Sequence, residues 1–215
     1  GGGERGWYGY GVGSVVGGSV VVGAVVGTVV STTTSFGGAV VEVVLVVLDW
    51  GGLLGLTLPM VAPQRYQGLL VMNTVLATGD MPLSPGFLGW REMCAKNPQF
   101  DIARLFARGN PQMDAAECAA YMAPYPDSGH RAATRVFAAM VPEFPDSDGA
   151  AVSRQARDFW RDQWSGKTLM AIGQQDPVLG LPVMQTLRAQ IRGCPEPMLL
   201  AQAGHFVQEH GEPIA

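Results

Sequence analysis

The stretch VVLVVLDWGG, residues 43–52, decides the fold. Its first six residues form a continuous aliphatic run rich in β-branched side chains, which is typical of a strand buried on both faces of a parallel sheet. The run ends abruptly at Asp49, which is followed by a tryptophan and two glycines. Because the glycines let the backbone pass close to a helix start, we predict a sharp strand-to-helix corner that exposes the Asp49 carboxylate.

The residues that follow repeat the alternation of strand and helix. Residues 53–58 are compatible with a helix, and Gly68 to Asn73 reads as a second buried strand. Strand, turn, helix and strand form a βαβ unit, whose right-handed crossover implies a parallel sheet. Further along we predict strands at 168–173 and 198–201, separated by a helix at 181–192.

Between these two parts lies a block with no strand-like alternation. It contains short amphipathic segments punctuated by prolines, at residues 100–107, 114–122, 130–140 and 152–164. We therefore predict an α/β fold with a mostly parallel sheet flanked by helices and an inserted helical cap, or lid. Residues 1–77 are the first part of the core, residues 78–164 the lid, and residues 165–215 the second part of the core.

Composition excludes several classes of protein. The 215 residues hold 14 lysines and arginines against 18 aspartates and glutamates, a formal charge of −4. No basic cluster is available for nucleic acid. The three cysteines are widely spaced, so neither a disulfide framework nor a zinc site is indicated, and we expect a reducing, cytoplasmic setting. No cluster of His, Asp or Glu has ligand spacing, so no metal or cofactor is implied.

Residues 1–47 differ from the rest of the chain, because they are mostly glycine and valine. The apolar run at 15–30 invites a membrane interpretation, but it is shorter than the roughly 20 residues that a spanning helix needs. No secretory signal is recognisable. We treat the segment as low-complexity and its identity as doubtful, and we draw no chemistry from it; an intact mass far from 22.7 kDa would show that the identities are wrong.

Two further candidate residues follow predicted strands. Asp176 comes after the strand at 168–173, and His205 after the strand at 198–201. Each alone has an ordinary structural explanation: Asp49 as a helix N-cap, Asp176 as a turn residue before proline, and His205 as a loop residue. Together they have the order nucleophile, acid, histidine, which resembles the triad of α/β-hydrolases, with the lid between nucleophile and acid.

Several separate motifs strengthen this resemblance. They are LDWGGLLGLTLP (48–59), GFLGW (86–90), MAIGQQDPVLG (170–180), GCPEPM (193–198) and AGHFVQEHGE (203–212). They look like the haloalkane dehalogenases, closest to the branch that includes the 1,2-dichloroethane-degrading enzyme. The resemblance runs from Leu48 to the end of the chain.

The resemblance implies roles for particular residues. Asp49 would displace halide by SN2 attack and form an alkyl-enzyme ester, and His205, supported by Asp176, would activate the water that hydrolyses it. Trp50 and Trp90 match the two tryptophans that bind the leaving halide through their indole N–H groups. Phe87 and Phe137 are candidate walls of the substrate pocket; packing alone would explain either of them, and Trp90 as well.

Two features depart from the family. Its members place a His-Gly-x-Pro turn well before the nucleophile, where a backbone N–H joins that of Trp50 in an oxyanion hole, but residues 1–47 contain no histidine. The similar string His210-Gly211-Glu212-Pro213 follows the catalytic histidine, so we regard it as a decoy. The chain is also short for the family, and we expect it to be a fragment or an incompletely described copy of a larger domain.

Three functions follow as hypotheses. The first is hydrolysis of small haloalkanes, with water as the second substrate, halide as a product, no nucleic acid, no membrane and a monomeric protein. The second is epoxide hydrolysis by the same Asp49, which requires paired lid tyrosines; Tyr121 and Tyr125 are the candidates. The third is a non-catalytic or membrane-associated protein in which the glycine- and valine-rich segment is the functional part.

Overall fold

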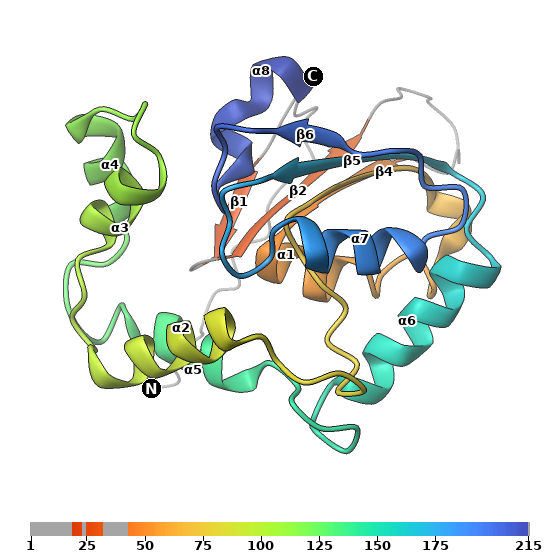
Figure 1. Ribbon diagram of the computed structural model, residues 1–215, viewed down its shortest axis with the longest axis horizontal. Helices are drawn as coiled ribbons and strands as arrows, with labels where there is room; N and C mark the ends of the chain where they lie inside the picture. Colours follow the sequence, from red (N-terminus) through yellow and green to blue (C-terminus); the bar gives the residue numbers. More distant parts are fainter. Residues whose placement is uncertain (1–18, 23–24, 32–42, 215) are drawn as a thin grey trace, which may run out of the picture.

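The computed structural model describes residues 19–22, 25–31 and 43–214, and for the first two ranges it describes the backbone alone. In these residues the strands form one sheet in the order β1-β2-β3-β4-β5-β6 (Figure 1). Strands β3 to β6 run parallel, and β1 and β2 join antiparallel at one edge. The bounds are Ser19–Val22, Val25–Ser31, Val43–Leu48, Tyr66–Met72, Lys167–Gly173 and Met198–Leu200.

The predicted mostly parallel sheet is confirmed. Each strand expected after residue 42 is present, within two residues of its predicted ends. The antiparallel strands β1 and β2 lie in the segment that we left without structure, and the rest of residues 1–42 lies outside the described part. The described helices include none that is long and apolar enough to cross a membrane.

The helices follow the predicted order with small shifts. The first begins at Asp49 itself rather than at residue 53, and α2 was not predicted as a helix, although Ser84 caps it and Pro85 occupies its first turn. The helices α1 to α8 span Asp49–Gly55, Pro85–Lys96, Ile102–Gly109, Ala115–Met122, Ala132–Met140, Ala150–Asp162, Leu181–Ala189 and Gly211–Ile214. Two 3₁₀ turns, η1 and η2, span Pro63–Arg65 and Val207–His210.

The main core lies between one face of the sheet and helices α1, α6 and α7 (Figure 1). Val47 and Val71 point into it from the strands, and Trp160 of α6 and Met184 of α7 meet them there, all of them at most 1% exposed. The opposite face packs near its carboxyl end on residues from η2 and α8. This core holds β3, β4 and β5 side by side, so that their carboxyl ends meet at one edge.

The packing of α6 bears on where the lid ends. We expected the lid to extend to residue 164, but α6 packs in the main core through Phe159, Trp160 and Trp164. The Trp160 indole N–H also donates to the Leu56 carbonyl oxygen at 2.8 Å. Because α6 covers the sheet, we propose that it belongs to the core and that the lid is limited to residues 78–148, which include α2 to α5.

Candidate active site

Asp49 occupies a strained corner between β3 and α1. Its φ angle is +48°, the only positive value among the non-glycine residues that the structure describes. Such a backbone conformation costs energy and persists where surrounding contacts enforce it. The N-cap of α1 is Leu48, and no side chain caps this helix. The interpretation of Asp49 as an N-cap is therefore wrong, whereas the predicted sharp corner is confirmed.

Two residues that follow β4 hold this corner in place. The backbone N–H of Asp49 donates to the Asn73 carbonyl oxygen at 3.1 Å. The Thr74 hydroxyl donates to the Asp49 carbonyl oxygen at 2.6 Å. Thr74 is fully buried and lies so close to α1 that a Cβ on Gly52 would come within 2.1 Å of its hydroxyl oxygen. The close approach therefore requires glycine at position 52.

The three predicted triad residues meet at the carboxyl edge of the sheet. His205 Nδ1 lies 2.7 Å from Asp176 Oδ2, a hydrogen-bond distance. His205 Nε2 lies 3.6 Å from Asp49 Oδ1 on the other side of the ring. The imidazole thus lies between two carboxylates. One of them is buried, and the other borders a cavity.

Asp176 is an acceptor of several hydrogen bonds. Its Oδ1 accepts the backbone N–H groups of Val178 and Leu179 at 2.8 and 3.0 Å, and its Oδ2 accepts from Asn73 Nδ2 at 2.9 Å. Burial disfavours the ionised carboxyl, but the bond from His205, the charge of His205 and the bond from Asn73 outweigh it and lower the pKa of Asp176 to about 2. Asp176 is therefore an anion at neutral pH that orients the imidazole.

His205 has the opposite shift. Burial disfavours its charged form, yet the charge of Asp49 and the hydrogen bonds to Asp176 and Asp49 outweigh burial and raise the pKa of His205 to about 10. In the free protein the ring is therefore protonated at neutral pH. Loss of the Asp49 charge lowers the pKa again, because that charge is the largest raising cause.

Sequence reasoning missed Asn73 as part of the site. Its side chain bridges two strands, since Nδ2 also donates to the Gly173 carbonyl oxygen at 3.1 Å and Oδ1 accepts the Gly173 N–H at 2.9 Å. We placed Asn73 at the end of a buried strand without a role. Its signal was its position: a polar residue at the carboxyl end of a strand beside that of the nucleophile.

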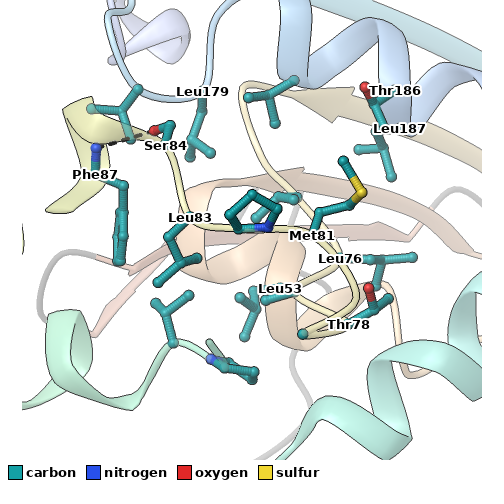
Figure 2. Close-up of a pocket in the computed structure, with 18 of the residues that line it drawn as sticks. Leu53, Leu76, Thr78, Met81, Leu83, Ser84, Phe87, Leu179, Thr186 and Leu187 are labelled. Carbon is teal, nitrogen blue, oxygen red and sulfur yellow. Dashed lines mark hydrogen bonds between the residues drawn. The ribbon is translucent and has the colours of Figure 1, made fainter. Parts of the chain in front are cut away.

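An apolar cavity of about 230 Å³ opens beside Asp49. Figure 2 shows side chains from the lid (Leu83, Phe87) and from the core (Leu53, Leu179) around it. Its few polar side chains include Asp49, Thr78 and Ser84. A pocket that is mostly apolar, with one carboxylate at its wall, fits a small and mostly apolar molecule.

The structure treats the four predicted aromatic residues differently. Trp50 and Phe87 line the cavity. Phe137 lies behind Trp50, with ring centroids 4.9 Å apart, and supports it rather than bordering the cavity. Trp90, one turn after Phe87 on α2, packs edge-on against Phe100 at 5.9 Å and lies outside the described lining. Trp50 thus borders the cavity and Trp90 does not, and a halide-binding role stays a prediction for both.

The predicted oxyanion hole is described in part. Trp50 lies in the first turn of α1, where backbone N–H groups have no partner within the helix. The second donor was expected before the nucleophile, in a segment that lies outside the described residues. The string at 210–213 spans the end of η2 and most of α8.

The parallel sheet, the corner at Asp49 and the meeting of Asp49, His205 and Asp176 at the carboxyl edge form the arrangement of an α/β-hydrolase. In agreement, residues 40–212 match the family described as alpha/beta hydrolase fold, and the chain belongs to this family. Its relatives are more particular. The chain is 33% identical to a haloalkane dehalogenase of Psychrobacter cryohalolentis over 81% of its length, and 30% identical to one of Mycolicibacterium paratuberculosis over 80%.

A solved structure shows the same similarity. The haloalkane dehalogenase DpaA from Paraglaciecola agarilytica, described as tetrameric, has a TM-score of 0.77 and 39% identity and covers 80% of this chain. The resemblance to haloalkane dehalogenases that the motifs indicated is therefore confirmed. The chain spans 58% and 57% of the two curated relatives and 57% of the solved structure.

Proposed function

We propose that the protein hydrolyses small haloalkanes to an alcohol and a halide. The observation that carries the proposal is the position of His205 between Asp49, at 3.6 Å, and Asp176, at 2.7 Å, beside an apolar cavity that Asp49 borders. The similarity to haloalkane dehalogenases supports it. Water and halide are the other small partners, and no cofactor takes part in the proposed steps.

The first step is an SN2 displacement. A carboxylate oxygen of Asp49 attacks the carbon that bears the halogen, the carbon–halogen bond breaks, and the halide leaves with the bonding electron pair. The indole N–H of Trp50, whose side chain lines the cavity, is the first predicted donor to the departing anion, and that of Trp90 is the second. The dry, apolar walls strengthen these hydrogen bonds.

The second step hydrolyses the ester. Esterification removes the charge of Asp49, so the pKa of His205 falls and the neutral ring becomes a base. His205 Nε2 then takes a proton from water, whose oxygen attacks the ester carbonyl carbon of Asp49, while Asp176 stabilises the imidazolium. The alkyl–oxygen product leaves as the alcohol, which regenerates the carboxylate. The net change consumes haloalkane and water and yields alcohol, halide and a proton.

The test is halide release from 1,2-dichloroethane and 1,2-dibromoethane. We expect turnover by the wild-type protein and none by Asp49→Asn, since asparagine tolerates the positive φ but is a poor nucleophile. The exposed Asp127→Asn serves as the matched control and should retain activity. In a single turnover in ¹⁸O-labelled water, the label should enter Asp49 and not the alcohol; labelled alcohol would contradict the ester.

Epoxide hydrolysis is the weaker alternative. The hydroxyl of Tyr121 donates to Glu209, and Tyr125 is buried in a separate cluster of the lid; neither borders the described cavity. Diol formation from styrene oxide without halide release would reverse this ranking.

We further propose a monomer, which light scattering can test, and a cytoplasmic location, supported by the three free cysteines.

A further inference from the structure

The loop that carries His205 has little regular structure of its own. It covers residues 201–206, between β6 and η2, and we call it the base loop. The imidazole ring of His205 is held by its hydrogen bond to Asp176. The backbone carbonyl oxygen of His205 accepts the N–H of Val207 at 3.0 Å. These bonds fix one ring nitrogen but leave the direction of Nε2 dependent on the backbone of the loop.

A stack of aromatic rings joins the base loop to the lid. Phe206 follows His205 directly and stacks on Phe106 of α3, with centroids 3.9 Å apart and planes 22° apart. Phe106 in turn stacks on Tyr121 of α4 at 3.8 Å and 20°. The Phe206 ring also meets the His205 ring edge-on at 5.2 Å. The imidazole therefore lies at the end of a row of four rings, two of which come from the lid.

Polar contacts fasten the same two parts. The hydroxyl of Tyr121 donates to Glu209 Oε1 in η2, and Gln208 Nε2 donates to the Tyr121 oxygen at 3.4 Å. Burial and the bond to Glu209 raise the pKa of Tyr121 to about 12, so the phenol keeps its proton. Gln112 in the α3–α4 connection contacts the ring of His210 at 3.2 Å. The lid thus contacts η2, which follows the base loop, as well as the base loop itself.

We infer that the α3–α4 hairpin of the lid, residues 102–122, positions His205 for ester hydrolysis, with Phe106 as a positioning residue that acts through Phe206. The inference rests on the proposed two-step reaction. His205 acts in the second step, and Asp49 carries out the first without it. Loss of the stack therefore slows hydrolysis of the ester and leaves its formation unchanged.

The experiment compares steady-state and burst kinetics of wild type and Phe106→Ala with 1,2-dibromoethane. We expect kcat to fall on the order of 10- to 100-fold, as displaced catalytic groups do, with kcat/KM unchanged, because that ratio reports the steps up to irreversible halide loss. A burst of one equivalent of bromide and an alkylated Asp49 in the mass spectrum should accompany the fall. Equal loss of both parameters, or loss of neither, would overturn the inference.

Three variants separate positioning from simple destabilisation. Ile102→Ala removes a buried side chain of the same helix that is not in the ring stack, and it should not split kcat from kcat/KM. Phe106→Tyr keeps the ring and should restore hydrolysis. Tyr121→Phe keeps the stack but removes the bond to Glu209, and it should shift kcat in the same direction to a smaller extent.

A second readout does not need activity. The proton on His205 Nδ1, bonded to Asp176, should give a low-field NMR signal in wild type and in Ile102→Ala, and the signal should broaden or vanish in Phe106→Ala. An unchanged signal in Phe106→Ala would overturn the positioning role. If the wild-type protein releases no halide at all, the proposed function fails. The low-field signal alone then tests whether the hairpin positions His205 through the base loop.

Discussion

His205 is protonated in the free protein because two carboxylates face the opposite nitrogens of its ring. A protonated ring cannot act as a base, so in the proposed reaction His205 acts only after it has lost this proton. In the proposed reaction, esterification of Asp49 removes the charge that raises the pKa of His205. The proposed first step therefore lowers the pKa of the residue that acts as the base in the second.

The shifted pKa values of His205 and Asp176 predict how the free energy of unfolding depends on pH. A histidine pKa raised from about 6.5 in the unfolded chain to about 10 stabilises the fold fully below pH 6.5, and this stabilisation is lost as the pH rises to 10. For Asp176, whose pKa is lowered to about 2, the stabilisation is present at neutral pH and is lost on acidification towards pH 2. Denaturant unfolding between pH 6 and 10 measures the alkaline effect.

Comparison variants identify the groups responsible. In His205→Gln the loss of unfolding free energy above pH 6.5 should be smaller than in wild type, and in Asp49→Asn it should end at a lower pH. NMR titration of His205 in Asp49→Asn should show a pKa below that of wild type. The same alkaline slope in all three proteins would contradict the assignment.

At the scale of elements, the corner at Asp49 depends on how closely α1 approaches the end of β4. The helix begins directly at a residue with positive φ, and the buried Thr74 hydroxyl bonds the carbonyl of that residue. A Cβ at position 52 would overlap Thr74, since its distances to the hydroxyl oxygen and to Cβ would be 2.1 and 2.5 Å. The helix can therefore dock only with glycine at this position.

Gly52→Ala should destabilise the protein by about 1–3 kcal/mol, the usual range for an overpacked core, and should displace Asp49 and abolish halide release. Gly89→Ala is the matched control: it lies in α2, and its Cβ would meet nothing within 4 Å. We expect this control to stabilise the helix by about 0.5–1 kcal/mol. Urea denaturation of both variants checks the pair, and equal effects would refute the steric argument.

At the scale of the whole molecule, one arginine of the core holds both ends of the lid. Arg154 of α6 donates to the Thr78 carbonyl oxygen at 2.7 Å, where the lid begins, and to the Pro145 carbonyl oxygen at 2.9 Å, close to where it ends. Its neighbour Arg157 pairs with Asp80 at 2.7 Å. Both ends of the lid are therefore fixed to the same helix of the core.

Arg154→Met should weaken the attachment of the lid ends to α6. It should lower the free energy of unfolding by about 1–2 kcal/mol, because two charged hydrogen bonds to backbone carbonyls are lost. Hydrogen exchange should accelerate at residues 78–80 and 144–147. Arg161→Met on the same helix removes exposed ion pairs with Asp158 and Asp162 and should leave both stability and exchange at those residues close to wild type, because solvent screens such pairs. Unchanged exchange in Arg154→Met would show that the lid is held elsewhere.

Local pattern was sufficient for the strands, the corner and the order of the three site residues. A continuous aliphatic run identifies a buried strand, glycines after it identify a tight turn, and parallel strands place their carboxyl ends at one edge. For these reasons Asp49, Asp176 and His205 could be named before the structure. The same local logic failed for α6, whose amphipathic pattern indicates a buried face but not which surface covers it.

Contacts between residues far apart in the sequence could be identified only from the tertiary structure. Asn73 reaches Asp176 across 103 positions, and Phe106 meets Phe206 across 100. Trp90 packs on Phe100 and is not among the residues that line the described cavity. Sequence spacing specifies which residues share a strand end or a helix face, because those relations follow from backbone geometry. Which faces meet depends on the packing of the whole molecule. Tertiary packing therefore decides the contacts that hold the corner at Asp49, the contact between the lid and the base loop, and the walls of the cavity.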